Sequence, residues 1–233
     1  MKLGILKTGG PPPAAARFGT YPEMFRRLLG EAGFAYRTYA ADEGELPADA
    51  GECAAYLITG SAAAAYEASP WIDELKGFLK AAKGRARLVG VCFGHQVMAE
   101  AFGGRVIKSP KGWGVGVHTY EVLKPQPWMD GASPIRLPAS HQDQVVEAPP
   151  GAEVIAASVF TPIGALAYRD QPAVSLQLHP EFEPDYAVAL LKSRRGGALT
   201  ADQADRAIET YQAGDDRTRV GGWIRNFLLG GTS

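Results

Sequence analysis

A cysteine between two glycines is the residue of this chain best suited to nucleophilic chemistry. Cys92 lies in the sequence Gly-Val-Cys-Phe-Gly at 90–94, which follows a short apolar run and precedes a helix-like stretch that ends near Phe102. Strand, sharp turn and helix in this order are typical of a nucleophile elbow, in which the glycines allow the turn. The helix end also favours the thiolate. A cysteine that only fills the core would have the same sequence neighbours, so the partners of Cys92 must decide between a nucleophile and a core residue.

The segment His-Pro-Glu-Phe at 179–182 supplies the two partners that a thiol nucleophile needs. It follows the apolar strand-like run 174–178, and residues two apart in an extended chain point to the same side. Glu181 is therefore predicted to accept the ring N–H of His179, while the other ring nitrogen faces the thiol. Each residue alone would be interpreted as a satisfied histidine or a solvated carboxylate. Because His179, Glu181 and Cys92 are all predicted to lie at strand ends of one sheet, the three residues together predict a catalytic triad.

Strand-like and helix-like segments alternate through the first half of the chain, which predicts a parallel sheet covered by helices on both faces. Catalytic groups in such sheets gather at the carboxyl ends of the strands, where Gly60, Cys92 and the residues after Leu178 are predicted to lie. Residues 105–171 have short alternating runs rich in glycine and proline, which indicate β-hairpins laid against the parallel sheet. Strands are expected at 3–7, 34–39, 56–59, 88–91 and 174–178. Helices are expected at 22–33, closed by Gly30 or Gly33, from a cap at Ser69 to about Ala82, and at 96–102, 184–195, 200–213 and 219–229.

The fold class predicted by these elements is a three-layer, flavodoxin-like α/β fold. It has a mostly parallel central sheet, helices on both faces and an added β-hairpin region. The length of 233 residues suits one large α/β domain, so a single domain is expected over residues 1–233.

Composition and charge exclude several classes of protein. The net charge of −1 gives no indication of a nucleic-acid partner, and no apolar run approaches the roughly 20 residues that a membrane span needs. The two cysteines, Cys53 and Cys92, are too few for a disulfide-stapled fold, so a reducing, cytoplasmic location is predicted. The four histidines lack the spacing of metal ligands, and neither a metal nor another cofactor is expected.

The motifs at 90–96 and 179–182 together resemble those of the class I glutamine amidotransferases. The pattern is most similar to small stand-alone members and to the glutaminase domain of GMP synthetase, and it extends from Ile58 to Phe227. The resemblance implies that Cys92 is the nucleophile, His179 the base and acid, and Glu181 the carboxylate that orients the histidine.

The same resemblance implies roles for residues around the triad. The N–H groups of Gly60 and Phe93 would form the oxyanion hole, although the sequence Thr-Gly-Ser at 59–61 departs from the Gly-Gly-Pro type found in the family. Gln142 stands where the synthetase domain has glycine. The backbone contact at this position, and with it the preference for glutamine as substrate, can therefore differ in this chain. The residues that would hold the substrate are Gln96, Ser140, His141 and Gln142.

Three functions remain open at this point. The first is hydrolysis of the side-chain amide of glutamine through a γ-glutamyl thioester, which releases ammonia that a separate acceptor enzyme could use. The second is a stand-alone hydrolase of γ-glutamyl peptides or amides that uses the same triad. The third is a catalytically silent binding or regulatory subunit. In all three, Arg194 and Arg195 are interpreted as a solvated helix end.

Overall fold

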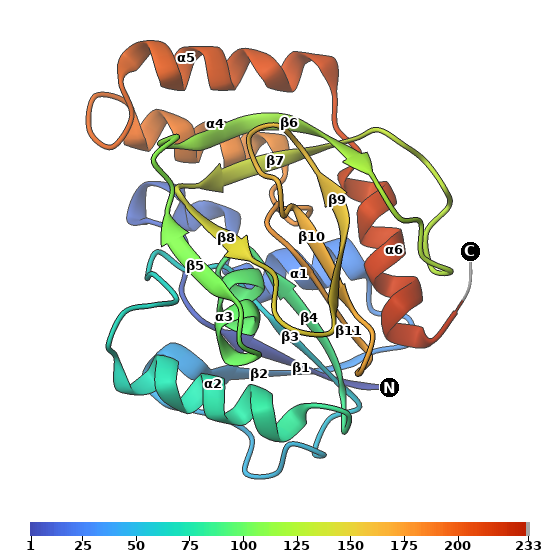
Figure 1. Cartoon of the computed structure of the whole chain (residues 1–233). Helices are drawn as coiled ribbons and strands as arrows, with labels where there is room; N and C mark the ends of the chain where they lie inside the picture. The colour runs from blue at the N-terminus through green and yellow to red at the C-terminus, as the bar shows by residue number, and fades with distance from the viewer. Residues whose placement is uncertain (232–233) are drawn as a thin grey trace.

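Five parallel strands form the part of the central sheet that leads to Cys92. The computed structural model describes residues 1–231, and its main sheet has nine strands in the order β2-β1-β3-β4-β11-β10-β9-β6-β7 (Figure 1). Neighbours from β2 to β11 are parallel, so their carboxyl ends meet at one edge of the sheet. These strands are β1 (Lys2–Lys7), β2 (Ala35–Ala40), β3 (Ala55–Ile58), β4 (Arg87–Val91) and β11 (Ala173–Leu176).

The second half of the sheet is antiparallel and extends it edge to edge. The prediction of hairpins laid against the parallel sheet is wrong in this respect, because β10 pairs with β11 in the same sheet. This pairing satisfies the backbone groups of β11 that would otherwise form an open edge. The antiparallel strands are β6 (Gly114–Val122), β7 (Ile135–His141), β9 (Ala152–Ala157) and β10 (Ala165–Tyr168), whereas β5 (Arg105–Lys108) and β8 (Asp143–Glu147) form a separate two-stranded sheet.

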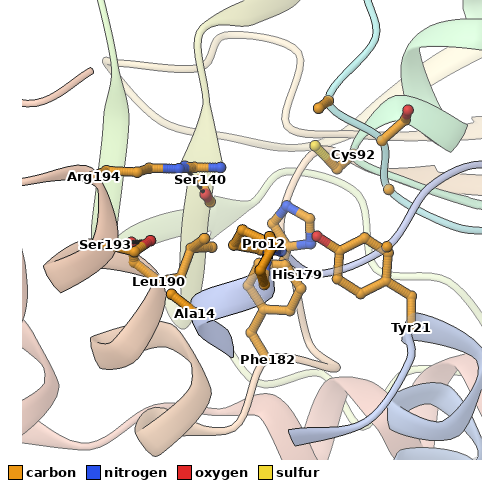
Figure 2. Close-up of a pocket in the computed structure, with 15 residues that line it drawn as sticks. Pro12, Ala14, Tyr21, Cys92, Ser140, His179, Phe182, Leu190, Ser193 and Arg194 are labelled. Carbon is orange, nitrogen blue, oxygen red and sulfur yellow. Dashed lines mark hydrogen bonds between the residues drawn. The ribbon is translucent and has the colours of Figure 1, made fainter. Parts of the chain in front are cut away.

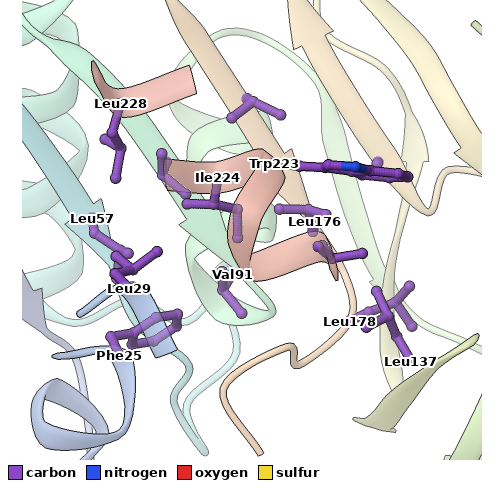
Figure 3. Close-up of a cluster of buried hydrophobic side chains, with 14 of the residues drawn as sticks. Phe25, Leu29, Leu57, Val91, Leu137, Leu176, Leu178, Trp223, Ile224 and Leu228 are labelled. Carbon is purple, nitrogen blue, oxygen red and sulfur yellow. The ribbon is translucent and has the colours of Figure 1, made fainter. Parts of the chain in front are cut away.

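Helices cover both faces of the parallel strands, as the sequence predicts. The helices α1 (Tyr21–Leu29) and α6 (Arg217–Leu229) pack on one face, and α2 (Pro70–Ala82) and α3 (Phe93–Ala101) pack on the other. Figure 3 shows the first of these layers, in which Trp223, Ile224 and Leu228 of α6 meet apolar side chains of the strands. The predicted three-layer α/β fold is therefore confirmed.

The two remaining α-helices follow β11 in the chain. They are α4 (Pro184–Arg194) and α5 (Ala201–Glu209), accompanied by the short 3-10 turns η1 (Pro13–Phe18) and η3 (Thr210–Ala213), while η2 (Ala41–Glu43) follows β2. The expected helix 200–213 thus changes to 3-10 geometry at Thr210. No helix within residues 1–231 is both long and apolar enough to cross a bilayer.

The predicted end of α1 and the predicted cap of α2 differ in detail from the structure. The helix expected at 22–33, with Gly30 or Gly33 as its closing residue, ends at Leu29, because Gly30 has a φ of 74° and breaks the helical path. Ser69 precedes α2 as expected, but its side chain makes no capping hydrogen bond. Its backbone carbonyl instead accepts from the N–H groups of Ile72 and Asp73 at 3.0 and 3.1 Å.

The turn from β4 into α3 depends on close backbone contacts at both glycines. A Cβ atom at residue 90 would lie 2.5 Å from the carbonyl oxygen of Gly94, and one at residue 94 would lie 2.4 Å from that of Ile58. Between them, Cys92 has a φ of 54° and a ψ of −104°, a conformation that costs a non-glycine residue about 1–3 kcal/mol. The packing of β3, β4 and α3 around the turn maintains this strain.

Gly94→Ala is expected to lower the free energy of unfolding by about 1–3 kcal/mol or more, because the methyl group would displace the backbone of β3. Chemical denaturation measures the change. Gly77→Ala is the matched control: Gly77 is an exposed glycine in α2 with no atom within 4 Å of the added Cβ. That variant should gain up to about 1 kcal/mol from helix propensity. Equal stability of the two variants would contradict the close-contact explanation.

Candidate active site

Cys92 lies at the carboxyl end of β4 and immediately before the first turn of α3. Its N–H donates to the carbonyl of Leu176 at 2.8 Å, and its own carbonyl accepts from Gln96 at 3.0 Å. The backbone of the nucleophile candidate is therefore bound on one side to β11 and on the other to α3. The side chain is buried but lines a cavity, so its sulfur faces both the protein interior and a space for ligand.

His179 and Glu181 are brought together by a turn that follows β11. Nδ1 of His179 lies 2.7 Å from Oε1 of Glu181, and both side chains are buried. The predicted contact is present, but not through an extended chain: the N–H of Phe182 donates to the carbonyl of His179 at 3.3 Å, which closes a turn. The ring of Phe182 also stacks on His179, with centroids 3.8 Å apart and planes 7° apart. These contacts fix the orientation of the imidazole.

Gly60 lies beside both His179 and Cys92. A Cβ placed on Gly60 would be 3.2 Å from Cε1 of His179 and 3.8 Å from Cβ of Cys92. Both side chains therefore border the same small volume at the end of β3. The fold brings together three residues, Gly60, Cys92 and His179, that span 119 positions of the chain.

Electrostatics favour a protonated imidazole at this position. Burial lowers the pKa of His179, but the charges of Glu181 and Cys92 and hydrogen bonds to both side chains raise it, and the net result is a pKa of about 10. The imidazole is then cationic at neutral pH. A cation beside a thiol favours the thiolate, which is the reactive form.

The two residues expected to form an oxyanion hole flank Cys92. The carbonyl of Gly60 accepts from Oγ1 of Thr8 at 3.1 Å and from Oγ1 of Thr59 at 3.2 Å, which orients its peptide. Within residues 1–231, the N–H of Gly60 donates to no other backbone group. Phe93 is the first residue of α3, where an N–H has no intrahelical acceptor. The oxyanion role of both residues remains a prediction.

The expected substrate residues lie around a second cavity beside Cys92. Gln96 donates through Nε2 to the carbonyl of Asp143 at 3.0 Å and to Oε1 of Gln177 at 3.1 Å. His141 is buried, and burial lowers its pKa to about 3, so the ring is neutral and suited to a structural or hydrogen-bonding role. Gln96, Ser140, His141 and Gln142 all line this cavity, and their role in binding substrate remains a prediction.

Two cavities meet at Cys92 and together form the candidate site. The larger, of about 540 Å³, is lined by His179, Tyr21, Phe182 and other side chains (Figure 2). The smaller, of about 310 Å³, is lined by Gln96 and the segment 140–143. Cys92 and Arg194 line both cavities. The sulfur thus lies at a junction, as a nucleophile must if the two parts of a cleaved substrate occupy separate spaces.

The other histidines have structural partners. His95 is fully buried in α3, its Nδ1 lies 2.8 Å from Oγ of Ser175, and burial lowers its pKa to about 3. His118 is within hydrogen-bond distance of the carbonyl of Val115. In residues 1–231, no three His, Cys, Asp or Glu side chains are arranged to hold a metal ion.

Arg194 is the residue whose importance the sequence interpretation missed. It is half-buried rather than a solvated helix end, and its Nη1 donates to Oγ of Ser140 at 2.7 Å. Its spacing could have indicated this, because Tyr186, Leu190 and Arg194 follow one another at four-residue intervals and therefore share a helix face. Its neighbour Arg195 is exposed and pairs with Asp205, as a solvated helix end should.

Comparison with known proteins agrees with this geometry. Residues 18–192 match the family model of glutamine amidotransferase class-I. The chain belongs to the class I glutamine amidotransferase family. This membership confirms the family resemblance that the two sequence motifs indicated, and it makes the chain a relative of amidohydrolases.

Relatives of this class I amidotransferase family member differ in how much of their length they share with it. It is 27% identical to gamma-glutamyl peptidase 4 of Arabidopsis thaliana, over 97% of this chain and 94% of that protein. It is 31% identical to the GMP synthase of Pyrobaculum aerophilum, over 91% of this chain but only 40% of the synthase. A glutamine amidotransferase crystal structure from Thermotoga maritima superposes with a TM-score of 0.73 at 17% identity, covering 98% of this chain and 96% of the other. This likeness supports the fold.

Proposed function

We propose that this chain hydrolyses γ-glutamyl amide bonds through a thioester on Cys92, with His179 and Glu181 completing a catalytic triad. The observation that carries the proposal is the buried hydrogen bond between His179 and Glu181 beside a strained cysteine at the junction of two cavities. Membership of the family supports the same chemistry.

In the first half of the reaction, the Cys92 thiolate attacks the γ-carbonyl carbon and a C–S bond forms. The negative charge that develops on the carbonyl oxygen is stabilised by the N–H groups of Gly60 and Phe93, the type of contact that contributes most to acyl transfer. The tetrahedral adduct collapses as the C–N bond breaks. The cationic imidazole of His179 gives its proton to the departing nitrogen, and the amine leaves.

In the second half, a water molecule enters the position that the amine has left. The neutral imidazole of His179 takes a proton from this water as it attacks the thioester carbonyl. The C–S bond then breaks, which releases the glutamyl carboxylate and restores the thiolate and imidazolium pair. Glu181 keeps the imidazole oriented and stabilises its positive charge in both halves.

Glutamine and larger γ-glutamyl compounds both contain the bond that this mechanism breaks. With glutamine the leaving group is ammonia, which a separate acceptor enzyme would consume. Two observations favour a larger amine as the second candidate. The gamma-glutamyl peptidase relative matches along nearly its whole length, and the cavity on the His179 side is large enough for more than ammonia.

The test combines turnover with direct detection of the thioester. Purified protein is assayed for ammonia release from glutamine and for amine release from a panel of γ-glutamyl peptides and amides. The reaction is then quenched in acid, and the peptide that contains Cys92 is examined by mass spectrometry for an added γ-glutamyl group. Turnover of at least one substrate together with acylated Cys92 is expected. An unmodified Cys92 and no turnover of any substrate would favour a catalytically silent subunit instead.

A further inference from the structure

The two cavities beside Cys92 differ in which part of a substrate they can accept, if the proposed function holds. His179 lines the larger cavity and not the smaller one, whereas Gln96 lines only the smaller one. The imidazole must reach the departing nitrogen, so the leaving amine lies on the side of the larger cavity. The glutamyl part then occupies the smaller cavity.

Charges in the smaller cavity suit the glutamyl part, which has an α-ammonium and an α-carboxylate. Its lining includes the carboxylates of Glu67 and Asp143 and the ammonium of Lys108. Burial raises the pKa of Asp143, whereas the Lys108 charge lowers it, so these groups influence one another electrostatically. Arg194 also borders this cavity, but even without it two acids and one ammonium provide a partner for each end of an amino acid zwitterion. The cation needed for the α-carboxylate is therefore already present on this side.

The larger cavity is mostly apolar and far exceeds the space that ammonia needs. It is lined by the rings of Tyr21 and Phe182, by Leu190 and by Pro12 and Pro13 at the start of η1 (Figure 2). Its volume is about 540 Å³, and one water molecule in the liquid takes only about 30 Å³. Apolar walls of this size suit an amine that carries a hydrocarbon or aromatic side chain.

Arg194 places one positive charge on the wall of this apolar cavity. Its guanidinium donates to Ser140 and lies 5.0 Å from the ring centroid of Trp113, but it forms no ion pair with any Asp or Glu among residues 1–231. Burial lowers the pKa of Arg194, and no carboxylate of the described residues acts against this effect. A half-buried guanidinium without a carboxylate partner is costly unless a ligand supplies the anion.

We propose that Arg194 binds a carboxylate of the leaving amine, so that the preferred substrates are γ-glutamyl amino acids or peptides with an apolar side chain next to the scissile amide. Arginine is suited to this task because its planar fork of N–H groups matches a carboxylate and is always charged. Ser140 holds the fork in position from β7. The proposal rests on the proposed function and specifies its substrate class.

The test uses two substrates that differ only in the carboxylate in question. γ-Glutamyl-phenylalanine and γ-glutamyl-phenethylamide have the same scissile bond and the same aromatic group. The expected wild-type ratio of kcat/KM for acid over amide is about tenfold to a hundredfold, as for a charged hydrogen bond. Arg194→Gln should bring the ratio close to one, and Arg194→Lys should keep part of it. Arg195→Gln, which removes the neighbouring exposed arginine, should leave the ratio and the activity as in the wild type.

Each contrary result points to a different error. A wild-type ratio near one would overturn the proposal without any variant, so an Arg194 variant that fails to fold does not prevent a decision. Equal loss on both substrates in Arg194→Gln would overturn it as well, since Arg194 would then bind the glutamyl carboxylate or support the fold. Turnover of neither substrate nor of glutamine, with unmodified Cys92, would instead refute the proposed function itself.

Discussion

Cys92→Ala abolishes measurable turnover of γ-glutamyl substrates, with an expected loss of at least about 10⁴-fold, the scale seen when a covalent nucleophile is removed. The loss is this large because, within residues 1–231, no other thiol shares the cavities: Cys53, the second cysteine, is buried beside Tyr39. Without a sulfur at residue 92 no thioester forms. The proposed oxyanion donors and binding contacts remain, and such contacts alone give only a small residual rate.

Initial rates of amine release and intact-protein mass spectrometry with an alkylating substrate analogue measure this effect. Cys53→Ser is the matched control, because it changes the other cysteine and leaves the candidate site intact. It should retain activity and should still be labelled once, at Cys92. Activity in Cys92→Ala that exceeds a few parts in 10⁴ of the wild type would contradict the thioester mechanism.

Glu181→Gln is expected to lower kcat/KM by about 10²- to 10⁴-fold and to move the alkaline limb of the pH profile to lower pH. The charges of Glu181 and Cys92 help to hold the pKa of His179 at about 10, against the effect of burial. Thioester formation needs the protonated imidazole, so in the wild type kcat/KM falls as the pH rises through about 10. Removing the carboxylate charge lowers the His179 pKa, and the fall then begins nearer neutrality.

The raised pKa of His179 in the wild type also makes the stability of the fold depend on pH. A histidine whose pKa is higher in the folded than in the unfolded state stabilises the fold most below its ordinary pKa of 6.5, and this contribution is lost as the pH rises toward about 10. Glu181→Gln should flatten that dependence. Glu183→Gln, which changes a nearby surface carboxylate paired with Arg27, is the control and should leave both profiles unchanged. Identical pH profiles for Glu181→Gln and the wild type would remove Glu181 from its proposed role.

Local patterns were sufficient to predict which residues lie together at the candidate site and most of the scaffold. The glycines on either side of Cys92 indicated a sharp turn, and the observed backbone angles and close contacts show why no larger residue fits there. The spacing of His179 and Glu181 indicated their hydrogen bond, although a turn rather than an extended strand forms it. Helix ends were less accurate, because two glycines could close the first helix and only the structure shows that Gly30, the first of them, ends it.

The sequence by itself determined the fold class, the family and the residues that could form a nucleophilic set, since these depend on residue types a few positions apart. Only the tertiary structure decided that the antiparallel strands continue the main sheet, and that Arg194 borders the cavities while Arg195 faces solvent. Sheet pairing and the sharing of a cavity depend on contacts between residues that are distant in the chain. Such contacts leave no local periodicity, so two adjacent arginines look alike in sequence although one is half-buried against Ser140 and Trp113.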